Sequence, residues 1–101
     1  MMWYSYLRKF LFFLGPESAH RLTLSLLRYI PRFCMATIPG VETTCMGLTF
    51  DNPVMMAAGF DKNGEYVDAL LRLGFAGVEV GTVTPQPQPG NPKPRCFRIP
   101  E

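Results

Sequence analysis

Residues 53–84, PVMMAAGFDKNGEYVDALLRLGFAGVEVGTVT, decide the fold. The apolar run at 53–58 has the length of a strand, and the run at 76–84 is rich in β-branched residues, which favours a second strand. Between them, Val67, Leu70 and Leu71 recur at helical spacing before a glycine that ends the pattern. A strand, a helix and a strand in this order form a βαβ unit with parallel strands. The sequence therefore predicts an α/β fold.

Small and polar residues gather where the two predicted strands end. Gly59, Asp61 and Lys62 follow the first strand, and Gly81, Thr82 and Thr84 lie in the last part of the second. In parallel α/β units, ligands bind beyond the carboxyl ends of the strands. Small residues there let a flat or bulky group approach the backbone, and a lysine adds positive charge beside it. We expect the two ends to be neighbours in space and to form a ligand site.

The region before this unit predicts a linker and a further extended run. Residues 31–44 contain two prolines and a glycine without a clear period, which is typical of a linker. The runs at 45–50 and 53–58 are separated by Asp51 and Asn52, a turn-like pair. We expect a hairpin or a tight passage between these two runs.

The N-terminal part of the chain predicts two helices. The first ends at Gly15 and has an apolar stripe made of Trp3, Leu7, Phe10, Leu11 and Leu14. The second begins at Pro16, runs to about Ile30 and has a polar face that includes Arg21 and Arg28. Together they offer more apolar surface than a two-helix hairpin can bury. Either they pack on the rest of the protein, or they contact a membrane surface with aromatic residues in the interface and arginines toward the head groups.

Composition and motifs exclude several classes of function. A formal net charge of +2 is too small to indicate nucleic acid binding. Three widely spaced cysteines without a C-x-x-C motif indicate neither a disulfide framework nor a metal site. The apolar run that follows Arg8 and Lys9 extends only over residues 10–14, which is too short for a signal core or a membrane span. Walker, dinucleotide-binding and nucleophile-elbow motifs are absent from the sequence.

The last stretch, residues 85–101, is dominated by six prolines. It must be irregular or resemble polyproline, because proline fixes its own backbone and lacks an N–H donor. A ligand for SH3-type modules is one interpretation. A long loop that leads to another strand is the interpretation we favour.

In order and spacing, several motifs resemble the class 2 dihydroorotate dehydrogenases, which are membrane-associated and quinone-linked. The motifs are PESAHRL at 16–22, AAGFDKNGE at 57–65 and GTVTPQPQPGNPKPR at 81–95. The resemblance covers essentially the whole chain. It implies an FMN-containing (β/α)₈ TIM barrel preceded by a small two-helix domain that touches the membrane and opens a tunnel for ubiquinone. The implied domains are a membrane and quinone-tunnel domain at 1–33, a linker at 34–44 and the start of the FMN-binding barrel at 45–101.

The resemblance also implies roles for individual residues. The residues expected to bind FMN are Ala58, Gly59, Phe60, Asp61, Lys62 and Thr82. Lys62 also matches a lysine that contacts the substrate, dihydroorotate or its product orotate. His20 and Arg98 match residues of the quinone site. No metal and no nucleic acid are implied. The expected location is peripheral on a membrane, at the cytoplasmic face of the inner membrane if the cell is bacterial.

The length of the chain limits what the resemblance can supply. A (β/α)₈ barrel takes roughly 250 residues, whereas this sequence has 101. We expect the chain to contain no catalytic base, to bind FMN weakly or not at all when isolated, and to be inactive by itself. The alternative is a non-catalytic truncated product or a membrane-associating helical module.

Overall fold

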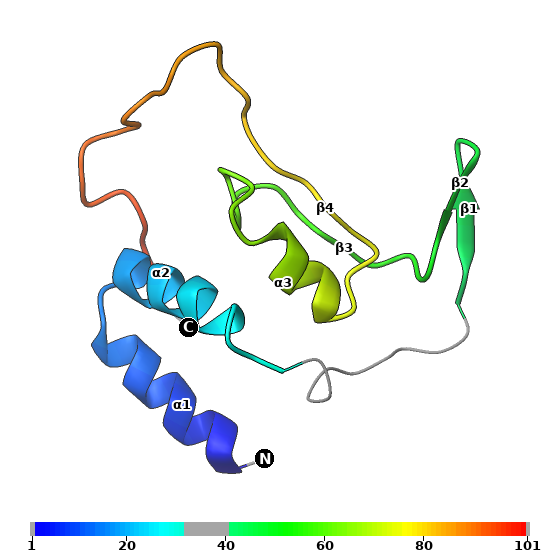
Figure 1. Cartoon of the computed structure of the whole chain (residues 1–101). Coiled ribbons are helices and arrows are strands. Elements are labelled where there is room, and N and C mark those ends of the chain that lie inside the picture. Colours follow the sequence, from blue (N-terminus) through cyan, green and yellow to red (C-terminus); the bar gives the residue numbers. More distant parts are fainter. Residues whose placement is uncertain (1, 32–40, 101) are drawn as a thin grey trace. The chain divides into compact units, whose positions relative to one another are not determined.

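The computed structural model describes residues 2–31 and 41–100, which form two compact units. The helical unit consists of residues 2–26 and 88–100, and the strand unit consists of residues 27–31 and 41–87. Among the described residues, two helices come first and are followed by short strands and a third helix (Figure 1). The α/β class predicted from the sequence is confirmed.

The helical unit contains α1 (Met2–Phe13) and nearly all of α2 (Pro16–Leu27). The predicted stop between them is confirmed, and the Gly15 carbonyl accepts the Ala19 N–H at 2.9 Å in the first turn of α2. Helix α2 ends three residues before the predicted Ile30. The reason is local, because a proline at position 31 disfavours helical backbone in the residue before it.

The proline-rich residues 88–100 belong to the helical unit and contain neither helix nor strand, as the sequence predicted. Arg95 organises this segment by donating to the Pro89 carbonyl at 2.9 Å and to the Glu17 carboxylate at 2.9 Å. Gly90 lies against the same guanidinium, since a Cβ there would be 2.8 Å from Arg95 Nη1. Lys93 adds a second, longer ion pair of 3.5 Å to Glu17.

The strand unit begins with a hairpin of β1 (Thr43–Cys45) and β2 (Leu48–Phe50). Its two-residue turn consists of Met46 (φ 49°) and Gly47 (φ 76°), a pair of positive φ angles that matches the right-handed twist of the strands. Of the two alternatives predicted for the runs at 45–50 and 53–58, the hairpin is wrong, because Leu48–Phe50 pairs with Thr43–Cys45 instead. Residues 51–54 form a short passage to the next strand, which belongs to a second two-stranded sheet. The run at 45–50 itself contains the turn, and β1 starts inside the predicted linker. Residues 32–40 of that linker lie outside the described residues.

The predicted βαβ unit is confirmed. Strands β3 (Met55–Met56) and β4 (Gly77–Val78) are parallel, with Met55 opposite Gly77, and α3 (Val67–Arg72) connects them (Figure 1). The core of the unit is formed by Ala69 and Leu70 of α3. Both strands are shorter than predicted, since the parallel register covers only two residues of each strand.

Asn52 joins the start of this βαβ unit to the segment that follows α3. It is 4% exposed, donates from Nδ2 to the Gly74 carbonyl at 2.8 Å and accepts the Val54 N–H on Oδ1 at 2.9 Å. The sequence predicted only a turn residue at this position. The structure shows a buried side chain that joins the residue before β3 to the glycine that ends α3.

Candidate functional site

The carboxyl ends of β3 and β4 lie next to each other, as predicted from the sequence. The two strands are parallel neighbours, and the Gly81 N–H donates to the Lys62 carbonyl at 3.0 Å. This bond joins the segment after β4 to the loop after β3. Thr82, which follows Gly81, is exposed beside this junction. The structure therefore brings together the predicted residues 58–62 and Thr82 in one region of the strand unit.

The small residues after β3 leave their backbone open. Ala58 is exposed, and Gly59 has a φ of +99° with no atom within 4 Å of the position that a Cβ would occupy. This left-handed conformation favours glycine, and the open space lets a planar group approach the peptide backbone. Phe60 is partly exposed, and Lys62 is exposed. The arrangement can present backbone donors and one ammonium to a flat anionic ligand.

Asp61 has a different environment from the residues around it. Its side chain is 3% exposed. Oδ1 accepts the Glu65 N–H at 3.0 Å, and Oδ2 accepts the Tyr66 N–H at 2.8 Å. Both carboxylate oxygens thus accept hydrogen bonds from the backbone of the loop that leads into α3.

Arg28 is a residue at this loop that the sequence analysis missed. Its guanidinium donates to the Glu65 carbonyl at 3.1 Å and lies 4.4 Å from the centre of the Tyr66 ring. The helical spacing predicted Arg28 only as one member of the polar face of the second helix. No local pattern links it to residues 37 positions later in the chain.

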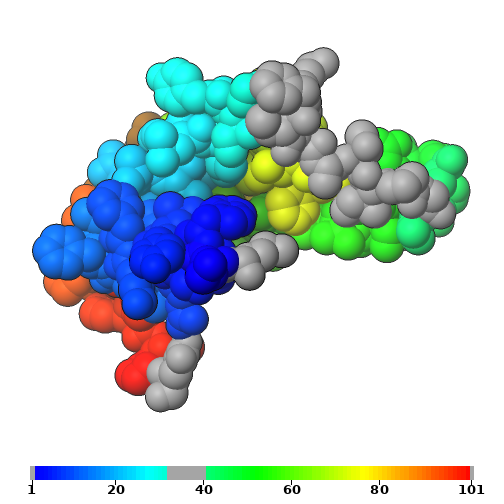
Figure 2. All heavy atoms as spheres, turned by 90° about the horizontal axis from the view of Figure 1, so that it is seen from below, coloured from blue at the N-terminus to red at the C-terminus, as the bar shows by residue number. Residues whose placement is uncertain are grey.

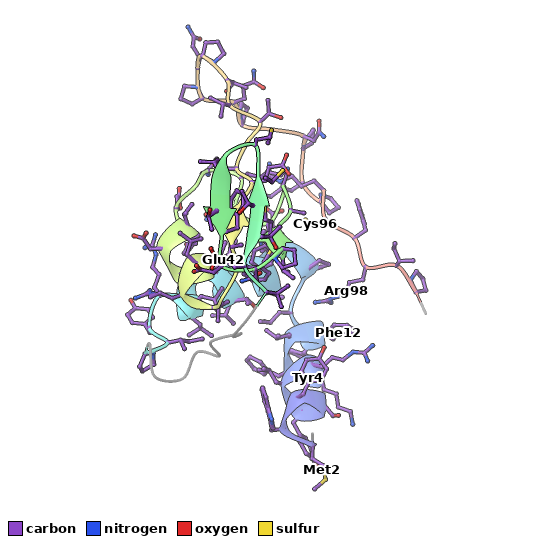
Figure 3. All side chains as sticks on the ribbon, turned by 90° about the vertical axis from the view of Figure 1, so that its right-hand side faces the viewer. Met2, Tyr4, Phe12, Glu42, Cys96 and Arg98 are labelled. Carbon is purple, nitrogen blue, oxygen red and sulfur yellow. The ribbon has the colours of Figure 1, made fainter. Side chains whose placement is uncertain are left out.

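The predicted quinone residues His20 and Arg98 both belong to the helical unit. His20 is half-buried on α2. Arg98 lies at the C-terminal end of α1 and donates to the carbonyls of Leu11, Phe12 and Leu14 at 2.8, 3.0 and 2.9 Å. Its guanidinium is also 4.5 Å from the centre of the Phe12 ring (Figure 3). Arg98 therefore caps α1, and a contact with quinone remains a prediction.

Glu17 of the helical unit forms ion pairs with Arg95 and Lys93. The hydrogen bond and the charge of Arg95 lower the pKa of the Glu17 carboxyl, and Lys93 acts in the same direction. Reciprocally, the same hydrogen bond raises the pKa of Arg95. At neutral pH the pair is therefore fully charged and attaches residues 88–100 to the start of α2.

Helix α1 exposes aromatic side chains along its length, and Figure 2 shows this helix in dark blue with its side chains at the surface. Trp3, Phe10 and Phe12 are 66%, 58% and 52% exposed. No helix among residues 2–31 and 41–100 is long and apolar enough to cross a membrane. The same residues contain no cluster of three or more side chains of the types that bind metals.

Comparisons with known proteins point to one family. The family described as dihydroorotate dehydrogenase matches residues 40–101. A protein of Acinetobacter baylyi named dihydroorotate dehydrogenase (quinone) is 58% identical over 99% of this chain and 30% of its own length. A Legionella pneumophila protein of the same name is 58% identical over 97% of this chain and 29% of its own length.

Solved structures give the same result. The Eimeria tenella DHODH in complex with ferulenol matches with a TM-score of 0.72 and 48% identity, over 83% of this chain and 23% of that one. The ligand-free form of the Eimeria tenella protein matches equally well. The chain spans about 30% of the length of the curated relatives it matches. The family match covers more than half of the sequence, and the similarity to the relatives covers nearly all of the sequence. The chain therefore belongs to the dihydroorotate dehydrogenase family.

Proposed function

We propose that this chain contributes to the FMN-dependent oxidation of dihydroorotate to orotate in pyrimidine biosynthesis, with a quinone as the electron acceptor. The observation that carries the proposal is the junction of the two strand ends, where the Lys62 carbonyl accepts the Gly81 N–H beside the open backbone of Gly59. The names of the relatives support the choice of substrate and acceptor.

In this proposal, the βαβ unit is the start of a (β/α)₈ barrel. The parallel pairing of β3 and β4 and the position of α3 between them in the chain support it. The corresponding division of the chain has a membrane and quinone domain at 1–33, a linker at 34–44 and the barrel from 45 onward. The compact units of the structure differ in two respects, because residues 27–31 group with the strand unit and residues 88–100 group with the helices.

The residues after β3 and β4 fit a flavin. The open space at Gly59 accommodates a planar ring against the backbone, while Ala58 and Phe60 flank it and Thr82 offers a hydroxyl from the second strand end. When bound, FMN accepts the electrons of dihydroorotate and delivers them to the quinone. In this proposal, Asp61 contributes through the loop that its carboxylate folds.

Lys62 supplies the charge of the site. Its backbone is fixed by the bond to Gly81, while its side chain is exposed and therefore available to a ligand. A fixed ammonium favours negative charge that develops on a neighbouring ring and can hold the carboxylate of orotate. No residue of this chain is assigned as the base that removes a proton from the substrate.

The helical unit is proposed as the quinone and membrane end. The exposed aromatic side chains of α1 suit the interface of a bilayer, where ring faces contact lipid and arginines reach head groups. His20 and Arg98 are the proposed quinone contacts. The protein would then be peripheral on a membrane, at the cytoplasmic face of the inner membrane in a bacterial cell.

The test is a hybrid holoenzyme in which residues 1–101 of this sequence replace the matching part of the Acinetobacter baylyi protein. We expect the purified hybrid to retain FMN and to reduce a ubiquinone analogue with dihydroorotate. Lys62→Ala should lower the rate of flavin reduction by dihydroorotate at least tenfold, because one charge-assisted contact is worth about 1.5–3 kcal/mol. Lys9→Ala, an exposed lysine of α1, is the control. Normal flavin content and turnover in Lys62→Ala would refute the site.

The second candidate function, a helical module that associates with membranes without catalysis, is favoured by the exposure of α1. Under either function, the chain should bind phosphatidylcholine vesicles, and replacing Trp3, Phe10 and Phe12 by serine should weaken binding at least tenfold. Met46→Ser and Val83→Ser, which change side chains that are 92% and 84% exposed outside the helices, are the controls. Vesicle binding together with an inactive hybrid would favour the second function.

A further inference from the structure

Asp61 is the one acidic side chain that is buried among the described residues. Burying a carboxylate is costly unless it is hydrogen-bonded, so its environment requires an explanation. The explanation is local, since each oxygen accepts one backbone N–H from the loop before α3, from Glu65 and from Tyr66. The Asp61 carbonyl also accepts the Gly64 N–H at 3.3 Å. Residues 61–66 are thus folded around one carboxylate.

Two further contacts fix this loop from outside. The Gly81 N–H holds the Lys62 carbonyl on one side. On the other side, Arg28 donates to the Glu65 carbonyl and stacks on the Tyr66 ring. The backbone from which the Lys62 side chain extends therefore lies between a buried carboxylate and the end of β4. The Lys62 side chain itself is exposed, so the position of its ammonium depends on this backbone.

We propose that Asp61 is a positioning residue that folds the 61–66 loop and thereby sets where the Lys62 ammonium meets the substrate and the flavin, and that Arg28 braces the same loop. The inference rests on the proposed function for the identity of the ligand. It assigns the Asp61 carboxylate to the backbone and not to the cofactor. It also gives a role at the site to Arg28, which follows α2 in the chain.

The experiment uses the hybrid holoenzyme described above, with Asp61→Asn as the test variant. Asparagine preserves one acceptor oxygen but presents an NH₂ group to the second N–H, so one loop bond is lost without a change of size. We expect flavin reduction by dihydroorotate to slow about tenfold, while flavin content and reoxidation by quinone stay within twofold. Asp68→Asn is the matched control, because Asp68 is exposed in the first turn of α3 and loses the same charge.

Arg28→Gln provides an independent perturbation of the loop. We expect a slowing of about threefold in the same step, because Arg28 holds the loop through one hydrogen bond and one ring contact at the surface. The double variant should be slowed less than the product of the two single effects, since both act on one loop. If Asp61→Asn fails to fold, the selective effect of Arg28→Gln decides the question.

Amide hydrogen exchange of the 101-residue chain tests the loop itself. In Asp61→Asn, the amides of Glu65 and Tyr66 should exchange about tenfold faster, and in Asp68→Asn they should not change. An active wild-type hybrid with a normal Asp61→Asn variant would overturn the inference. So would lost flavin content with unchanged Glu65 and Tyr66 exchange, which indicates direct contact with the cofactor. An inactive wild-type hybrid refutes the proposed function instead, and the exchange measurement then still decides whether Asp61 folds the loop.

Discussion

Replacement of Asn52 by alanine is the most direct test of how the βαβ unit is held together. The side chain is 4% exposed and bonds both the Gly74 carbonyl and the Val54 N–H. Alanine removes both bonds and leaves both backbone groups without their partners inside the unit. We expect the parallel pairing of β3 and β4 to weaken, because the residue before β3 is no longer attached to the end of α3.

The magnitude follows from the two hydrogen bonds. Each neutral bond contributes about 0.5–1.5 kcal/mol, and a backbone group left unsatisfied adds about 1 kcal/mol or more. Since water can reach part of the opened site, we expect a loss of about 2–3 kcal/mol in the free energy of local opening. This corresponds to exchange that is about 30- to 150-fold faster at the amides of the strand pair.

Local hydrogen exchange is the appropriate assay, because a chain with two compact units has no single free energy of unfolding. The reporters are the N–H groups of Ala76 and Glu79, which donate to the Val54 and Met56 carbonyls at 2.9 and 3.0 Å. Asn63→Ala is the control, because Asn63 is an exposed asparagine in the same unit. If the two variants exchange at the same rate at both reporters, the reasoning about Asn52 is wrong.

Three further perturbations test other contacts. The lowered pKa of Glu17 means that its ion pair with Arg95 stabilises the fold above pH 4.5 and is lost as the pH falls below 4.5 through the folded-state pKa. A carbon-13 titration of the Glu17 carboxyl should give a midpoint below 4.5, and this midpoint should rise in Arg95→Gln. Equal midpoints in the two proteins would contradict the pairing. Arg98→Ala should speed the hydrogen exchange of the amides in the last turn of α1 about 5- to 30-fold. Arg98→Lys should restore less than half of this protection, because an ammonium cannot span three carbonyls. Gly47→Val should lower the stability of the hairpin by about 1–2 kcal/mol, because valine is strained at a φ of 76°, and should abolish the cross-strand nuclear Overhauser effects. The control Gly15→Ala should leave these signals intact, and retained signals in the valine variant would refute the turn geometry.

The sequence by itself determined the elements whose signals are local. Helical spacing, with Gly15 and Gly74 as stop signals, predicted α1, α3 and the start of α2. These signals are local because a helix is specified by residues three and four positions apart. The order of strand, helix and strand predicted the parallel pair and the meeting of its ends. The motifs at 16–22, 57–65 and 81–95, taken together in their order and spacing, predicted the family.

Only the tertiary structure decided which side chains support the site. Asp61 and Lys62 are adjacent in the sequence, yet the first is buried in its own loop and the second is exposed. Arg28 and Asn52 reach partners 37 and 22 positions away, which no periodic pattern encodes. The physical reason is that a buried backbone group must find a hydrogen-bond partner wherever the folded chain places one, and that choice depends on three-dimensional proximity and not on spacing along the sequence.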